Sequence, residues 1–263
     1  MNAYDKVQIA RSKDRPTAVS YIEQLFHDTF EFHGDRKFGD DSAIIGGIGY
    51  LENIPVTFIA IERGSDTASR IQRNFGCPKP EGYRKALRLI KQAEKFSRPV
   101  ICLVDTSGAF CGEDAEERGQ GQAIAENLME MMGINTPIIS IVIGEGGSGG
   151  ALGLAVADKV YMLEDAIYSV ISPEGCASII WKDSKKAPEA AEYLHITADD
   201  MLSFGVAETI IPEDFKHFRN MCKLMKSQIL EDFNYLSSVP KDKLLVNRYN
   251  RFRNIGVYYE KEV

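Results

Sequence analysis

The segment Gly144-Glu-Gly-Gly-Ser-Gly-Gly-Ala-Leu-Gly153 holds six of the 22 glycines of this 263-residue chain. It follows a short apolar run that predicts a buried strand over 137–143, and a short helix to about residue 157 is expected behind it. Small residues at such a junction leave backbone N–H groups free at the start of the helix, where they can bind an anion. The interpretation of fold and function therefore begins at this junction.

Two further loops have the same character. Asp105-Thr-Ser-Gly108-Ala109 follows a predicted strand over 99–104, and Ser172-Pro173-Glu174-Gly175 opens a helix, with Ser172 as N-cap and Pro173 as first residue. Strands and helices alternate along the chain, which is typical of a layered α/β domain with largely parallel strands. Because such loops can meet at the carboxyl ends of neighbouring strands, we expect one site lined by peptide groups that stabilises a developing oxyanion.

The glycine segment also permits other interpretations. Gly144 to Gly149 match GxGxxG, and Glu164 lies 20 residues after Gly144, which together form the fingerprint of a dinucleotide-binding domain. Against this, the following helix is short and the match comes after at least four predicted strands. A Walker A loop is excluded because no Lys-Ser/Thr pair follows the glycines. Ser148 meets the GxSxG spacing of a hydrolase nucleophile, but a run of glycines produces that match almost automatically.

The remaining elements fit one domain. Apolar spacing predicts longer helices over 17–29, 81–97, 115–132 and 213–236. Strand-forming runs occur at 43–51 and 55–61 (as a hairpin), 159–163, 167–171 and 206–211. Asp114 and Glu117 have the spacing of a capping box at the start of the helix over 115–132. We predict a single domain over 1–263, with a flexible start at 1–14 and a C-terminal helical tail at 240–263. The Arg and aromatic residues of this tail permit nucleic-acid stacking, but a helix docked on the body is favoured.

Composition and charge exclude several classes. No apolar run approaches the roughly 20 residues of a membrane span, and we expect no signal peptide because the first residues lack an apolar core. Five scattered cysteines disfavour a disulfide framework and favour a reducing, cytoplasmic setting. The net charge of −7 argues against a general nucleic-acid binder. Ten basic residues against four acids between Glu62 and Arg98 form either a zone that receives an anionic substrate or a solvated helix face.

No side chain stands out as a catalyst or as a metal ligand. The four histidines have no metal-like spacing to cysteines or carboxylates, so we predict no metal site in this chain. Cys111 lies in a loop, and nothing in the sequence marks a base that would activate it. The chemistry expected here therefore rests on backbone donors.

Several longer strings in the chain are far more specific than GxGxxG. They are Arg73–Gly76, Pro80–Leu89, Ala115–Gln120, Gly144–Leu152 and Tyr168–Ser178, together with Arg15-Pro16 and Gly34-Asp-Arg36. In these strings, which span about Arg15 to Pro212, the chain resembles the carboxyltransferase α subunit of bacterial multi-subunit acetyl-CoA carboxylase. The resemblance implies a crotonase-like (ClpP/crotonase) fold, an α/β spiral of ββα units with C-terminal helices.

The resemblance also implies an activity and partners. It implies transfer of a carboxyl group from carboxybiotin, held on a separate biotin carboxyl carrier protein, to acetyl-CoA, giving malonyl-CoA for fatty acid synthesis. The chain would act with a β subunit as an α2β2 heterotetramer, and the ATP-using biotin carboxylase would complete the larger complex. A zinc ribbon and most of the acetyl-CoA site are expected in β. Because the biotin ureido nitrogen can take the acetyl proton, the α chain would need N–H donors rather than a side-chain base.

These expectations assign roles to particular residues. The Gly149 and Gly150 N–H groups are predicted to form an oxyanion hole that Gly146 and Gly147 shape. The other predicted contacts are Gly108 and Ala109 on the opposite wall, Ser172, Pro173, Glu174 and Gly175 beside biotin, and Arg63, Arg73 and Arg84 near anionic groups.

The loop at 105–112 departs from the family pattern Asp-Thr-Pro-Gly-Ala-Tyr-Pro-Gly. Ser107 and Cys111 replace two prolines, and Phe110 replaces the tyrosine. The rigidity of the loop and the preference among acyl-CoA substrates are therefore open. Two other function classes also stay open, namely an NAD(P)-dependent oxidoreductase using Gly144 to Gly149 and a non-catalytic assembly subunit.

Overall fold

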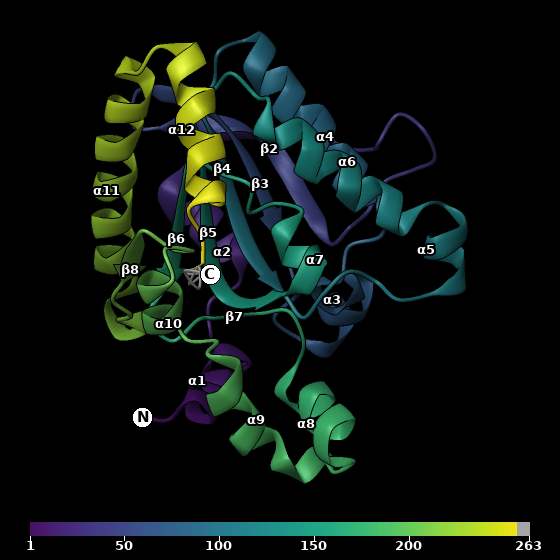
Figure 1. The fold of residues 1–263 in the computed structure, drawn as a ribbon. Helices are drawn as coiled ribbons and strands as arrows, with labels where there is room; N and C mark the ends of the chain where they lie inside the picture. Colours follow the sequence, from purple (N-terminus) through teal and green to yellow (C-terminus); the bar gives the residue numbers. More distant parts are fainter. Residues whose placement is uncertain (257–263) are drawn as a thin grey trace, which may run out of the picture.

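The computed structural model describes residues 1–256, and its framework is one mixed eight-stranded sheet (Figure 1). The strands are β1 (His27–Glu31), β2 (Ile44–Leu51), β3 (Ile54–Ile61), β4 (Val100–Thr106), β5 (Ile138–Gly147), β6 (Lys159–Leu163), β7 (Ile167–Ser169) and β8 (Thr209–Ile211). They are ordered β1-β2-β3-β4-β5-β6-β8, and β7 pairs with the far end of β5. The pairs among β1, β2 and β3 are antiparallel, and all later pairs are parallel.

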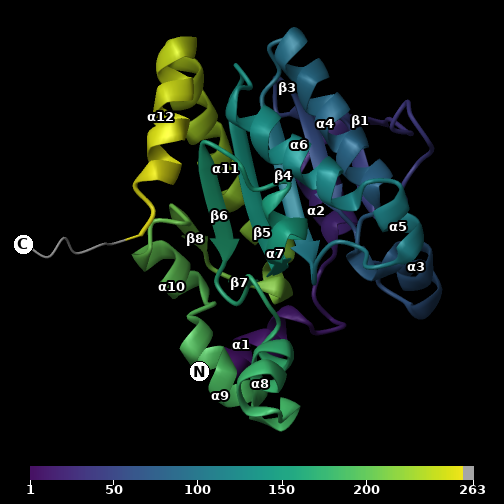
Figure 2. The ribbon, with the colours of Figure 1, turned by 45° about the vertical axis from the view of Figure 1, so that its right-hand side comes forward.

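Helices cover both faces of this sheet (Figure 2). They are α1 (Ala3–Ala10), α2 (Ala18–Leu25), α3 (Thr67–Gln72), α4 (Pro80–Lys95), α5 (Glu113–Glu117), α6 (Gln120–Met132), α7 (Ser148–Leu152), α8 (Pro173–Trp181), α9 (Ala187–Leu194), α10 (Ala198–Ser203), α11 (Phe218–Ser238) and α12 (Lys241–Arg253). Short 3-10 turns lie at Asn74–Gly76, Ser184–Lys186 and Phe215–His217. In the described part of the chain, no helix combines the length and the apolar character needed to cross a membrane.

The buried strands explain why the centre of the sheet is parallel. Every residue of β4 is buried, and so is every residue of β5 except its last. Strands buried on both faces have continuous apolar sequences and need helices on both sides of the sheet. The connecting helices α4, α6 and α7 cover one face, and α2 and α11 cover the other (Figure 2). The predicted hairpin is confirmed, because β2 and β3 pair directly around Glu52-Asn53, with Leu51 opposite Ile54.

Strand β5 is longer than predicted. It continues through Gly147, because Glu145, Gly146 and Gly147 pair with β7. A Cβ atom on Gly146 would lie 2.7 Å from Cδ2 of Tyr168, so the absence of a side chain lets β7 approach. Gly144, Gly146 and Gly147 therefore belong to strand β5, and the turn into α7 begins only at Gly147 and Ser148.

Two predicted helices are divided or shortened. The predicted helix over 115–132 is two helices, α5 and α6, because Gly119 adopts φ +82° between them. The predicted capping box is wrong, since Gly112 is the N-cap of α5 and Asp114 instead pairs with Lys79 at 3.0 Å and Arg118 at 3.3 Å. The predicted helix over 17–29 ends at Leu25, because the next residues join the sheet as β1.

The expectation of a flexible start over 1–14 is not what the structure has. Helix α1 begins at Ala3 with a capping box between Asn2 and Asp5. Val7 and Ala10 are fully buried in a separate apolar cluster that includes residues of β7 and α9. Figures 1 and 2 show α1 beside α9, at the edge of the molecule farthest from α12. The N-terminal segment thus takes part in the packing around the end of β5.

The C-terminal tail docks on the body as the favoured interpretation predicted, and its residues 257–263 lie outside the described part. Arg248 of α12 is 1% exposed. Its guanidinium pairs with Asp158 at 2.7 Å and donates to the carbonyls of Met131, Ile134 and Thr136 at 2.7 to 3.0 Å. One buried arginine therefore ties the tail to the end of α6 and the start of β6.

Replacement of Arg248 by alanine tests this anchor. It leaves Asp158 buried without its ionic partner, and removal of one member of a buried ion pair costs about 3–5 kcal/mol. We expect a loss of that size in the free energy of unfolding, measured by urea denaturation. Tyr249→Ala, on the exposed side of α12, is the control and should change that free energy by at most about 0.5 kcal/mol. Equal effects of the two changes would show that α12 docks without this pair.

Candidate functional site

The structure brings two of the three predicted loops into direct backbone contact. Strands β4 and β5 are parallel neighbours, with Thr106 opposite Gly146, so the loops that follow them meet. A Cβ atom on Gly147 would lie 2.2 Å from the carbonyl oxygen of Ser107, and one on Gly150 would lie 2.4 Å from the N atom of Ala109. Contacts this short leave no room for any side chain. Close packing of the two backbones therefore requires glycine at positions 147 and 150.

Unpaired donors lie at the start of α7. The N–H groups of Ser148, Gly149 and Gly150 have no helical acceptor, because the residues four positions earlier belong to β5. Gly149 and Gly150 differ in their surroundings. A Cβ atom on Gly149 would meet only Cγ2 of Ile124 at 3.8 Å, whereas one on Gly150 would collide with the backbone of Gly108 and Ala109. On the opposite wall, the N–H of Gly108 is already used, since it donates to Oγ1 of Thr106 at 3.0 Å.

The third loop joins the same place. A small cavity of about 40 Å³ lies between the glycine turn and the start of α8. Glu145, Gly146 and Gly147 line one side, and Ser172 and Pro173 line the other. The predicted N-cap of α8 is confirmed, because Oγ of Ser172 accepts a hydrogen bond from the N–H of Gly175 at 3.1 Å. All three predicted loops therefore converge at the carboxyl ends of β4, β5 and β7.

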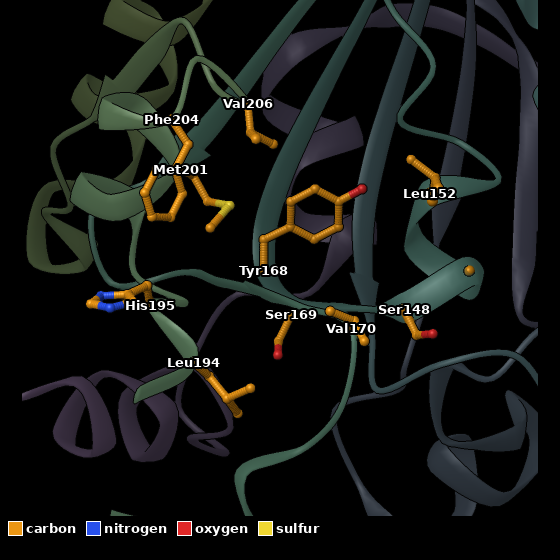
Figure 3. A pocket seen from close by; sticks show the side chains of 11 residues that line it. Ser148, Leu152, Tyr168, Ser169, Val170, Leu194, His195, Met201, Phe204 and Val206 are labelled. Atoms are coloured by element: carbon orange, nitrogen blue, oxygen red, sulfur yellow. The ribbon is translucent and has the colours of Figure 1, made fainter. Parts of the chain in front are cut away.

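A larger, mostly apolar cavity of about 450 Å³ adjoins the small one and shares Ser148, Ser169 and Val170 with it (Figure 3). Figure 3 shows Ser148 at one end and Leu194 and His195 at the other, and Gly149 also lines the cavity. Its walls also include Leu152, Tyr168, Ser169, Val170, Met201, Phe204 and Val206. Burial raises the pKa of Tyr168 to about 12, so its hydroxyl stays protonated near neutral pH. The sequence analysis missed this cavity, because its walls come from separate elements without a common motif.

Ser148 adopts φ +50°, a left-handed conformation that is rare for residues other than glycine. A strained serine between strand and helix is also the geometry of a hydrolase nucleophile. Figure 3 places Ser148 and His195 at opposite ends of the cavity, however, and no histidine in residues 1–256 has a recorded hydrogen bond to this serine. The described residues therefore show no hydrogen-bonded pair of Ser148 and a histidine of the kind that a serine hydrolase uses.

A group of buried charges lies directly beneath the glycine turn. Asp105, which is 2% exposed, accepts hydrogen bonds from the N–H of Glu145 at 2.9 Å and from Nη1 of Arg63 at 3.1 Å. Burial raises the pKa of Asp105, and the nearby Arg63 opposes that rise. Glu145 in turn pairs with Arg11 at 2.7 Å. Arg63 therefore supports the turn through Asp105. The sequence analysis assigned no site role to Asp105, Glu145 or Arg11, because no local motif marks them.

The structure does not bring Arg73 and Arg84 to the turn, and neither lines a cavity described above. Nη1 of Arg73 donates to the carbonyl of Ser42 at 2.6 Å. Arg84 pairs with Asp35 at 2.7 Å and with Glu81 at 3.0 Å. Burial raises the pKa of Asp35, but the backbone N–H groups that follow it and Arg84 outweigh this and lower that pKa to about 2. The contacts seen for both arginines are internal, and their substrate role stays a prediction.

The altered loop at 105–112 has its own supports. Phe110 donates its N–H to the carbonyl of Pro78 at 3.0 Å, and Nζ of Lys79 lies 4.7 Å from the centre of its ring. Nε2 of Gln120 donates to the carbonyls of Pro78 and Phe110 at 2.8 and 3.1 Å. Oγ of Ser107 lies 3.5 Å from Sγ of Cys77. Hydrogen bonds thus hold a loop that lacks the two family prolines.

Comparison with known proteins identifies the family. The family model described as acetyl co-enzyme A carboxylase carboxyltransferase-like matches residues 1–256. The acetyl-coenzyme A carboxylase carboxyl transferase subunit alpha of Ruminiclostridium cellulolyticum is 59% identical over 257 residues, which cover 98% of this chain and 99% of that protein. The subunits beta/alpha protein of Clostridium tetani is 53% identical over 265 residues, which cover 99% of this chain and 46% of that protein. The oxidoreductase alternative receives no support from these matches.

Solved structures agree on the fold. A Pseudomonas malonate decarboxylase hetero-tetramer in complex with coenzyme A has a TM-score of 0.69 and 18% identity, covering 89% of this chain and 94% of the matched chain. The transcarboxylase 12S hexamer has a TM-score of 0.66 and 18% identity, covering 99% of this chain and 46% of the matched one. The crotonase-like fold is thereby confirmed. With relatives at nearly 60% identity along its whole length, this chain belongs to the family of acetyl-CoA carboxylase carboxyltransferase α subunits.

Proposed function

We propose that this chain is the α subunit of an acetyl-CoA carboxylase carboxyltransferase, a single domain over 1–263 that moves a carboxyl group from carboxybiotin to acetyl-CoA and so forms malonyl-CoA. The observation that carries the proposal is the backbone contact between the loop at 107–109 and the turn at 147–150. It supports a site whose donors are peptide N–H groups. The names of the relatives support the choice of reaction.

The chemistry of the donors fits this reaction. When bound, carboxybiotin supplies both the carboxyl group and, after its loss, a ureido nitrogen that accepts the acetyl proton. The task of the chain is then to hold oxygen atoms on which negative charge develops. The N–H groups of Gly149 and Gly150, which have no helical acceptor, are the proposed donors, and their fixed orientation at the start of α7 costs no reorganisation during the reaction. The close packing of Gly146 and Gly147 sets their position.

The partners are also proposals. A β subunit is supported by the name of the relatives and by the Clostridium tetani protein, whose name joins beta and alpha subunits in one chain. We propose an α2β2 heterotetramer that works with a biotin carboxyl carrier protein and biotin carboxylase, with the zinc ribbon in β. The segment from Ser172 to Gly175, which borders the small cavity with its first two residues, is the proposed contact of the biotin group.

Reconstitution with β tests the function itself. The chain is co-expressed with its zinc-ribbon β subunit, and malonyl-CoA-dependent carboxylation of biotin is measured. We expect turnover by the complex and none by either subunit alone, because each contributes one side of the site. Assembly without turnover would favour the non-catalytic subunit. A rise in the thermal midpoint of the isolated chain with NAD or NADP would favour the oxidoreductase.

Replacement of Gly150 by alanine tests the oxyanion site. The added Cβ atom would collide with the backbone of Gly108 and Ala109, so the donors must move. Loss of one oxyanion donor lowers kcat by about 100- to 1,000-fold, and we expect a loss of this order in carboxyl transfer.

Gly121→Ala in α6 is the matched control, because nothing lies within 4 Å of its added Cβ atom. It should leave carboxyl transfer unchanged. The thermal midpoint and co-purification with β show whether each variant is folded. A folded Gly150→Ala complex with wild-type turnover would refute the oxyanion assignment.

A further inference from the structure

Arg11 joins two of the three loops that form the site. It lies at the C-terminal end of α1, where it is the C-cap residue. Its Nε and Nη2 atoms donate to the same oxygen of Glu145, Oε1, at 3.1 and 2.7 Å. Its Nη1 atom donates to Oε1 of Glu174 at 2.9 Å. One guanidinium therefore spans two carboxylates that are 29 positions apart in the chain.

Each of these carboxylates belongs to a different wall of the small cavity. Glu145 lies on β5 and lines the cavity directly, one residue before Gly146. Glu174 lies in the first turn of α8, directly after Ser172 and Pro173 on the other wall. The cavity between the walls measures only about 40 Å³, so a small change in their separation changes it greatly. We call this arrangement the Glu145–Arg11–Glu174 bridge.

We propose that Arg11 is a positioning residue for carboxyl transfer, because its bridge fixes the distance between the glycine turn and the start of α8. This inference rests on the proposed function of the site. Arg11 lines neither cavity, so it acts through Glu145 and Glu174. The planar, forked guanidinium suits this task, since it holds two acceptors in fixed directions, whereas a lysine ammonium is a single point charge.

The bridge is separable from the docking of α1. Val7 and Ala10 anchor that helix by burial among residues of β7 and α9, and the N–H of Ala3 donates to Oε1 of Glu192 at 2.8 Å. The inner link to Glu145 is shielded, since only 8% of that side chain is exposed. The outer link to Glu174 is partly open to solvent, with 37% of that side chain exposed, and such pairs add little to stability. A change at the Arg11–Glu174 pair should therefore alter the position of the start of α8 more than it alters the stability of the fold.

The experiment compares four changes in the complex with β. Arg11→Met removes both links, Arg11→Lys retains the charge without the fork, and Glu174→Met, which has no oxygen acceptor, removes only the outer link. Lys6→Met is the matched control, because Lys6 lies on the same helix and its Nζ atom contacts Asp165 at 3.4 Å, away from the bridge. Carboxyl-transfer kcat and KM, thermal midpoints and amide hydrogen exchange of residues 144–150 and 172–181 are measured for each.

We expect Arg11→Met to lower kcat about 100-fold, the effect of misplacing a reacting group by about 1 Å, with KM for acetyl-CoA nearly unchanged. Arg11→Lys should recover part of that loss. Exchange at 172–181 should rise in Arg11→Met and in Glu174→Met but not in Lys6→Met. The double variant Arg11→Met/Glu174→Met should be no slower than Arg11→Met alone, because both changes break the same link.

The outcomes separate this inference from the proposed function. Wild-type kcat and wild-type exchange in a folded Arg11→Met complex would overturn the bridge while leaving the carboxyltransferase assignment intact. Should Arg11→Met unfold because Glu145 loses its closest ionic partner and keeps only Arg63 at 3.9 Å, Glu174→Met decides the question, since it retains the inner link. If the wild-type complex transfers no carboxyl group, the proposed function fails, and the exchange of residues 172–181 alone decides whether Arg11 positions α8.

Discussion

The close approach of two backbones at the ends of β4 and β5 is the constraint on which the site depends. The carbonyl of Ser107 occupies the space where a side chain of residue 147 would begin, and the backbone at 108–109 does the same for residue 150. Parallel pairing of the two strands brings the loops to the same edge of the sheet, and the missing Cβ atoms let them touch. The start of α7 is consequently held against the neighbouring loop by backbone contacts at both Gly147 and Gly150.

A site made of peptide groups has to be positioned by whatever holds the backbone. In this protein, charged side chains next to the turn hold the backbone. Asp105 accepts a hydrogen bond from the N–H of Glu145, and Arg63 balances the negative charge of Asp105. Buried carboxylates are costly unless they are paired, and each of these has a cationic partner. The helix α1 contributes Arg11 to this group, so a segment expected to be flexible instead supports the turn.

The elements that the sequence predicted well have strong local signals. Continuous apolar runs marked β4 and β5, strand-forming runs marked the β2–β3 hairpin, and Ser172-Pro173 marked the start of α8. The errors have non-local causes. Gly119 breaks a helix whose apolar pattern continues across it, and β5 runs on to Gly147 because β7 pairs with it. The helix α1 is only eight residues long, too short to be stable alone, and its stability comes from packing against α9 and β7.

The sequence by itself determined the family, the α/β class and the three small-residue loops that meet at the ends of β4, β5 and β7, because these depend on residue types in short, contiguous strings. Only the tertiary structure decided which residues meet. It placed Arg63 beneath the turn and gave Arg84 internal partners, although both belong to the same basic stretch. It also assembled the cavity beside Tyr168 and linked Glu145 to Glu174 through Arg11. Such contacts join residues far apart in the chain, and no local pattern encodes the distances between them.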